Sequence, residues 1–113
     1  MKTELTKEQS EKLLSLGLDP ETPSYGYDYI TFGIGDLIAL LPRFIKRKRI
    51  DKGFILESKY DLTIQNYNKK WMVAYIDGGA NVAAVIFGEY HLIDGLYNLV
   101  LWCVEHGYIK TNV

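Results

Sequence analysis

Apolar and polar positions alternate through the middle of the chain. From Phe54 to Gln65 every second residue falls on one face, which is typical of a strand with one buried side. Two shorter strands are predicted at 71–76 (WMVAYI) and 82–87 (VAAVIF). Turn-forming residues separate them, NYNKK at 66–70 and Asp-Gly-Gly at 77–79. The pattern therefore predicts a three-stranded antiparallel meander.

Helical spacing precedes these strands. In the segment LTKEQSEKLLSLGL, Thr6 and Gln9 fit a capping box, and Gly17 fits the left-handed position that ends a helix. A second short helix is predicted at 34–41, because leucines and isoleucine recur there at helical spacing and Pro42 disfavours its continuation. Both helices are short, so packing has to hold them.

A longer amphipathic helix is predicted after the strands, within residues 89–106, and Gly107 ends it. Its expected core stripe consists of Leu92, Ile93, Leu96, Leu99, Val100, Cys103 and Val104. The opposite face carries His91, Asp94, Asn98 and Glu105, which we expect to face solvent. Leu101 and Trp102 are apolar but lie outside the stripe, which makes them candidate interface residues that meet the N-terminal helix or a partner chain.

These elements indicate one α+β domain over residues 1–113, with the long C-terminal helix packed on the sheet. The composition, 48% hydrophobic and 24% charged, is that of a chain that buries a core without disulfides or metals. No apolar run approaches the roughly 20 residues of a membrane span, and from the polar opening MKTELTKEQSEK we expect no signal peptide. With a single cysteine, the chain is expected to be cytoplasmic and to have no membrane partner.

No catalytic or metal-binding constellation is apparent. Cys103 lies about 18 Å along the helix from His91, and although His106 is close in sequence, the thiol belongs to the core stripe. The two histidines are about 22 Å apart and cannot share a metal ion. Gly33 is followed by Gly35, but the third glycine of a dinucleotide motif is absent. We therefore expect no enzyme, metal or cofactor; a third hypothesis is a small enzyme whose site forms between chains from His91, Asp94 and Asn98.

The charge distribution is uneven. The segment RFIKRKRIDK, residues 43–52, carries six basic residues and one acid, so its charge is +5, whereas the remainder carries −6. Its basic residues are Arg43, Lys46, Arg47, Lys48, Arg49 and Lys52. They are candidate contacts for nucleic acid or another anionic partner. The opposing interpretation is a charged loop that protects a sheet edge, with an acidic remainder that repels nucleic acid.

Aromatic surface favours a protein partner. Nine tyrosines are present, and Tyr25, Tyr27 and Tyr29 lie together in a segment of loop composition. Tyrosine buries a large area at a small entropy cost, which suits interfaces. The leading hypothesis is a non-catalytic module that binds a protein or a second copy of the chain, and nucleic-acid binding through residues 43–52 is the alternative.

The stretches LTKEQSEKLLSLGLD, FGIGDLIALLPRFI, WMVAY and LIDGLYNLVLWCVEHGYI together resemble a set of small uncharacterised proteins of gut anaerobes and of the prophages and mobile elements they carry. The shared positions are Gln9, Leu13, Leu14, Gly17, Leu18, Asp36, Leu37, Leu40, Leu41, Pro42, Trp71, Val73, Tyr75, Asp94, Leu96, Trp102, Gly107 and Tyr108. The resemblance implies a mobile-element origin and no particular activity. The run Lys46–Arg49 departs from the pattern.

Overall fold

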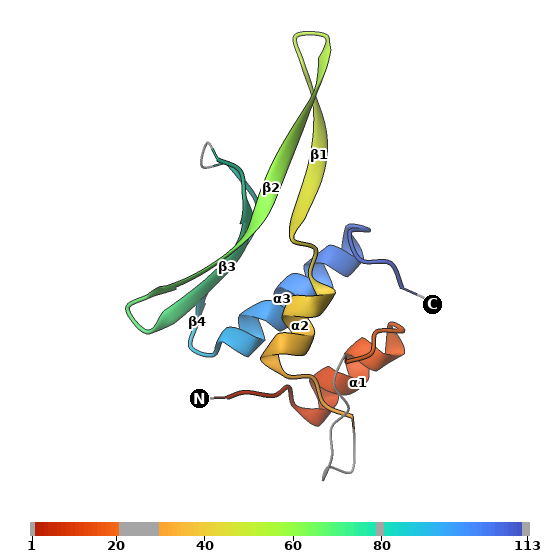
Figure 1. The fold of residues 1–113 in the computed structure, drawn as a ribbon, viewed down its shortest axis with the longest axis vertical. Helices are drawn as coiled ribbons and strands as arrows, with labels where there is room; N and C mark the ends of the chain where they lie inside the picture. The colour runs from red at the N-terminus through yellow and green to blue at the C-terminus, as the bar shows by residue number, and fades with distance from the viewer. Residues whose placement is uncertain (1, 21–29, 79–80, 112–113) are drawn as a thin grey trace.

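The computed structural model describes residues 2–20, 30–78 and 81–111, without the side chains of residues 49, 51, 87 and 88. The elements in chain order are α1 (Lys7–Ser15), α2 (Ile34–Leu40), β1 (Phe44–Asp51), β2 (Phe54–Tyr67), β3 (Lys70–Ile76), β4 (Val82–Glu89) and α3 (Leu92–Glu105). The strands form one antiparallel sheet in the order β1-β2-β3-β4. The helices lie together on one side of this sheet (Figure 1).

The α+β class is confirmed, but the prediction of three strands was wrong. The basic segment 43–52, expected to be a charged loop, contains the additional strand β1, and all eight of its residues pair with β2. Its outer part is exposed on both faces, so it lacks the alternation that reveals a half-buried strand. Lysine is also depleted in strands, which hides β1 further.

The predicted ends of the helices are confirmed. The Thr6 hydroxyl accepts a hydrogen bond from the Gln9 backbone N–H at 3.2 Å, and the Gln9 side chain accepts one from the Thr6 N–H at 3.0 Å. Gly17 has the positive φ, 81°, that the end of α1 requires. At the start of α2 the Asp36 carboxylate accepts from the Gly33 N–H at 2.8 Å, and the helix ends before Pro42.

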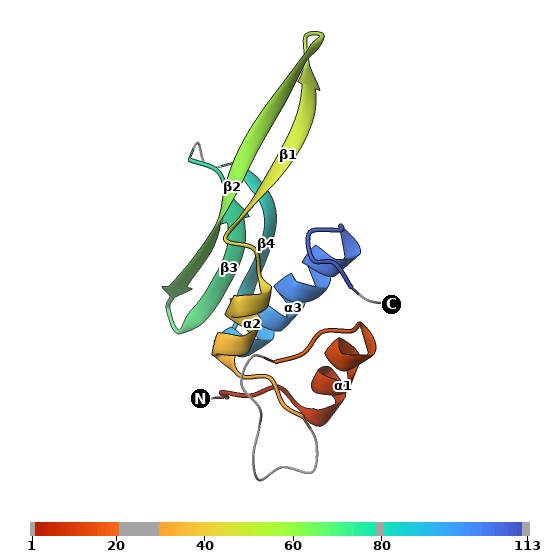
Figure 2. The same cartoon turned by 45° about the vertical axis from the view of Figure 1, so that its right-hand side comes forward.

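The core lies between α3 and the sheet, with α1 and α2 closing it from the other side (Figures 1 and 2). Five residues of the stripe predicted for α3 are fully buried, namely Ile93, Leu96, Leu99, Val100 and Cys103. Gly95 allows the close approach of this helix, because a Cβ there would lie 3.3 Å from a methyl group of Val73 on β3. Among the described residues, no helix combines the length and apolar character needed to cross a bilayer.

The strand β2 is shared between two hairpins. Its first half pairs with β1, and from Asp61 onward it pairs with β3. Residues 46–59, which we call the arm, therefore form a two-stranded ribbon that projects from the rest of the protein, which we call the body (Figure 1). The buried face predicted for β2 is only partly correct, because Tyr60, Leu62 and Ile64 pack against the core whereas the earlier part of the strand is largely exposed.

Candidate functional site

A tight turn closes the arm at its far end. Asp51 pairs with Phe54, so the loop has two residues, Lys52 and Gly53, whose φ values are 50° and 82°. Two consecutive positive φ values are those of a type I′ turn, which matches the right-handed twist of paired strands. The glycine takes this conformation without strain. The local sequence therefore specifies a continuous hairpin out to its end.

The cations of the arm occupy both of its faces. Residues directly opposite each other in an antiparallel pair share a face, so Lys46, Lys48 and Lys59 lie on the side facing away from the core. Arg47 has the same parity as the buried Ile45 and lies on the other side. Lys46 and Lys59 are directly opposite, an arrangement of like charges that disfavours strand pairing. Strand stability alone does not explain this placement.

The positive charge of the arm is little neutralised by neighbouring acids. Lys46 lies 3.8 Å from Glu57 and Lys59 lies 3.8 Å from Asp61, and about half or more of each side chain is exposed. Exposed ion pairs of this length contribute about 0–1 kcal/mol. The Lys59 ammonium also lies 4.5 Å from the centre of the Phe44 ring. These contacts hold the two ammonium groups close to the ribbon, where they remain accessible to a multivalent anion.

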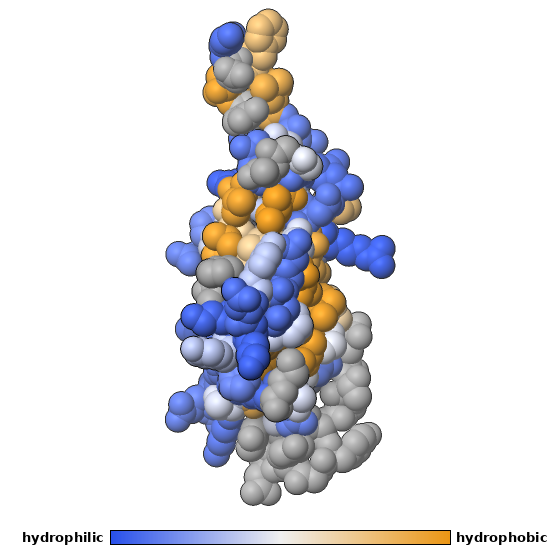
Figure 3. Space-filling view, turned by 90° about the vertical axis from the view of Figure 1, so that its left-hand side faces the viewer, coloured by the Kyte–Doolittle hydropathy of each residue, from blue (hydrophilic) through white to orange (hydrophobic). Residues whose placement is uncertain are grey.

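The far end of the arm is apolar. Ile50, Phe54 and Ile55 are 80%, 71% and 72% exposed. Figure 3 shows hydrophobic side chains at this projecting end. A strand edge guarded only against aggregation would not end in three uncovered large side chains, since such residues favour association. This end was not predicted from the sequence, because the alternation in β2 placed Phe54 on a buried face; the signal was a glycine turn between Ile50 and Ile55.

The arm and the body carry opposite charges. The arm has six basic residues and two acids, a net charge of +4, and the remainder of the chain has a net charge of −5. Each of its strands contributes six residues, so the arm is about 20 Å long at about 3.3 Å per residue. The Debye length is only about 10 Å at 0.1 M salt. The acids of the body therefore weaken an anion's attraction to the end of the arm very little. The acidic remainder of the chain is thus no argument against an anionic partner at this end.

The other predicted contact residues lie outside the arm, or their side chains are not among those that the structure describes. Arg43 is exposed at the base of β1, and the backbone of Arg49 is opposite Leu56. Tyr25, Tyr27 and Tyr29 lie outside the described residues.

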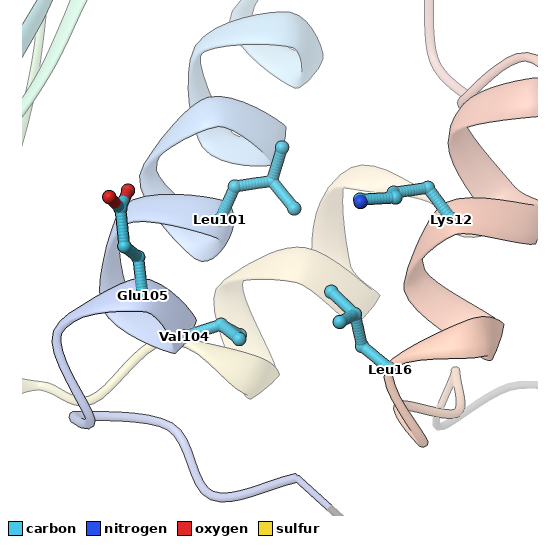
Figure 4. Close-up of a pocket in the computed structure, with 5 residues that line it drawn as sticks. All are labelled: Lys12, Leu16, Leu101, Val104 and Glu105. Carbon is cyan, nitrogen blue, oxygen red and sulfur yellow. The ribbon is translucent and has the colours of Figure 1, made fainter. Parts of the chain in front are cut away.

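The two candidate interface residues of α3 make contacts within the chain. Trp102 stacks on His106 and Tyr108, with ring centres 4.3 and 5.5 Å away. Leu101 faces α1 across an open groove of about 290 Å³. In Figure 4 Leu101 and Val104 point toward α1, where Lys12 and Leu16 complete the lining, and Glu105 points away from the space between the helices. The groove is a packing seam between α1 and α3 with mainly apolar walls.

Asp94 was expected to face solvent, but its carboxylate joins Lys2 and α1 to α3. Its carboxylate accepts hydrogen bonds from the Lys2 ammonium at 2.8 Å and from the Gln9 side chain at 3.3 Å. The Lys2 backbone N–H also lies 3.4 Å from His91 Nδ1. None of these four residues lines the groove between α1 and α3. The arrangement links α1 to α3.

The Asp94 contacts should make part of the free energy of unfolding sensitive to acid. Partial burial raises the Asp94 pKa, but hydrogen bonds from Lys2 and Gln9 and the nearby positive charges outweigh it, so the pKa is lowered. The stabilisation is therefore complete above the unfolded pKa of about 4 and is lost as pH falls through the lower folded pKa. We expect Asp94→Asn to destabilise by about 1 kcal/mol or less at pH 7 and by less at pH 2.5, measured by urea unfolding. An equal difference at both pH values would contradict this account.

The interpretation of Cys103 as a core residue is confirmed by its complete burial. Burial raises the pKa of its thiol to about 11, so the group is protonated at neutral pH. Within the described residues, no group of three histidine, cysteine or carboxylate side chains is placed to hold a metal ion.

No family model, curated protein or solved structure matches this chain. The resemblance to small proteins of gut anaerobes and prophages therefore stays a prediction. The arm has to be interpreted from its own geometry and charge.

Proposed function

We propose that this protein is a non-catalytic module that binds duplex DNA with the arm. The observation that carries the proposal is the placement of six of the chain's thirteen basic residues on a projecting two-stranded ribbon, away from the acidic body. Contacts from lysine and arginine to phosphates displace counterions and supply most of the affinity of sequence-independent binding. From the sequence alone a protein partner was the leading hypothesis and nucleic acid the alternative. Because the arm projects from the body, we now place nucleic-acid binding first.

The shape of the arm supports a duplex as the partner. The major groove of B-DNA is about 12 Å wide and admits a two-stranded β-ribbon, and several proteins place β-ribbons in one of the grooves. A ribbon with Lys46, Lys48 and Lys59 on one face and Arg47 on the other presents charge to the phosphates on both sides of a groove. The major groove of A-form RNA is too deep and narrow for such contacts.

Neutralising the arm tests this proposal. We expect the wild-type protein to raise the fluorescence anisotropy of a labelled 20-base-pair DNA duplex at 50 mM NaCl. Lys46→Ser, Arg47→Ser, Lys48→Ser and Arg49→Ser together should weaken binding by at least about 100-fold, because four phosphate contacts are lost. Circular dichroism and thermal unfolding should show that the variant remains folded, since Lys46, Arg47 and Lys48 are exposed.

A variant of equal charge provides the matched control. Lys7→Ser, Lys12→Ser, Lys69→Ser and Lys110→Ser remove four positive charges from the body. This control should retain affinity within a few-fold of the wild type if position on the arm matters more than net charge. The proposal fails if the wild-type protein does not bind the duplex at 50 mM NaCl, or if both variants lose affinity equally.

Protein binding remains the second candidate because the sheet has an apolar outer face. Val82 and Val85 on β4 are about half exposed, and on β3 Met72 and Ile76 share that face with them. Figure 3 shows hydrophobic side chains over this part of the sheet. A second copy could pack there face to face, as sheets do at about 10 Å separation. Sedimentation equilibrium should then show a dimer that Val85→Lys dissociates; a wild-type monomer up to 200 µM would exclude it.

A further inference from the structure

The end of the arm carries a compact apolar knob. Ile50 and Ile55 are directly opposite in the hairpin and share one face, so their Cβ atoms are about 4.5–5.5 Å apart. Phe54 is the neighbour of Ile55 in sequence and lies on the other face, opposite Asp51. The turn between the strands has only two residues, Lys52 and Gly53, so these apolar side chains lie directly behind it at the end of the ribbon.

The body does not account for this knob. On β2 the partly buried residues that pack on the core begin at Tyr60, and none of the described side chains of the arm is among them. Ile50 and Ile55 are paired in the ladder, and both remain more than 70% exposed. A turn with Lys52 and Gly53 would form equally well between polar strand positions. We therefore attribute the apolar side chains at this end to what the arm binds and not to the stability of the fold.

Charge surrounds the knob on the arm. Lys48 lies two residues before Ile50 on the same face, and Lys52 occupies the turn itself. A ligand of the knob therefore has an apolar interior beside negative charge. Stacked base pairs between two phosphate backbones have this character, and proteins that bend DNA insert isoleucine, leucine, phenylalanine or similar side chains between base pairs.

We propose that Ile50 and Ile55 form a wedge that enters between two base pairs and kinks the duplex. This inference rests on the proposed function, since the cations of the arm bring the wedge to the DNA. Insertion unstacks one base step, and the resulting bend lets the duplex follow more of the arm. The cations then govern affinity, and the wedge governs the shape of the bound DNA.

The bend can be measured by energy transfer between dyes at the two ends of a 30-base-pair duplex. Binding of the wild-type protein should raise the transfer efficiency, because a kink of 20–90° shortens the distance between the ends. Ile50→Thr with Ile55→Thr should bind with less than about tenfold loss of affinity and leave the transfer efficiency at that of free DNA. Threonine preserves the β-branched shape that suits strands, so the hairpin is retained.

Two controls make the measurement specific. Ile38→Thr makes the same change at an exposed position of α2 in the body, and it should bind and bend the duplex as the wild type does. A duplex with one central mismatch should bind the wild-type protein more tightly than a fully paired one, because a mismatched step unstacks more easily. The double threonine variant should show no such preference.

The outcomes separate the wedge from the proposed function. Binding without any rise in transfer efficiency, or an equal rise with the double threonine variant, overturns the wedge and leaves DNA binding by the arm in place. Failure of the wild type to bind the duplex overturns both. If the knob anchors a protein instead, the double threonine variant will match the wild type in duplex affinity, bending and mismatch preference, which also overturns the wedge.

Discussion

Replacement of residues 46–59 by Asn-Gly should give a folded protein that no longer binds duplex DNA. Ile45 and Tyr60 are directly opposite in the ladder at a hydrogen-bonded position, as Asp51 and Phe54 are, so a two-residue turn can join them without changing the register. Asn-Gly is the preferred sequence for the type I′ turn that fits such a connection. The deletion removes the apolar end and all six cations of the arm. We expect at least about a 100-fold loss of affinity by fluorescence anisotropy at 50 mM NaCl.

The shortened protein should keep its stability because the deleted residues lie outside the core. At the base of the arm Ile45 belongs to the core cluster and Tyr60 packs against it, and none of the described side chains between them does so. We expect the free energy of unfolding to change by less than about 1 kcal/mol, as for other changes to exposed positions. An arm-deleted protein that still binds DNA with wild-type affinity would contradict the proposed function, whereas one that unfolds would show that the arm supports the body.

A large stability loss is expected from truncation of Leu99 in α3. This side chain is fully buried in the stripe that packs against the sheet. Leu99→Ala should lower the free energy of unfolding by about 2–5 kcal/mol, because it removes apolar burial and leaves a cavity. Chemical denaturation monitored by tryptophan fluorescence is suitable, since Trp102 lies on the same helix. Duplex affinity should be unchanged while the protein is folded.

Ile55→Ala is the matched comparison for Leu99→Ala. It also shortens an aliphatic side chain, but Ile55 is 72% exposed and lies outside the core. Its effect on the free energy of unfolding should remain within about 0.5 kcal/mol. If Ile55→Ala costs as much as Leu99→Ala, the end of the arm is packed in solution and is not available to a ligand.

The helices could be predicted because local sequence determines them. The Thr6–Gln9 capping box, the glycine after α1 and the apolar stripe of α3 each depend on residues within a few positions of one another. The turn at 66–70 has the same local origin, and Asn68 and Lys69 there take positive φ values. The packing direction of α3 followed from periodicity alone, since its buried residues recur at helical spacing.

The features that were missed depend on contacts distant in sequence. The partner of Asp94 is Lys2, at the other end of the chain, and helical periodicity only shows which side of α3 the carboxylate occupies. Strand β1 could not be recognised from alternation because its outer part is exposed on both faces. The free end of the arm was hidden for a related reason: alternation in β2 indicates which residues share a face, and not whether anything covers that face.

The central claim is that cations of the arm contact DNA phosphates, and the salt dependence of binding tests it most directly. The logarithm of the association constant should fall linearly with the logarithm of NaCl concentration, with a slope near −0.9 for each phosphate contact. We predict a slope of about −4 to −5 for the wild-type protein, and a slope smaller in magnitude by about 3 or more for the variant with serine at residues 46–49. A wild-type affinity that does not vary with salt, or equal slopes for the two proteins, would contradict the account.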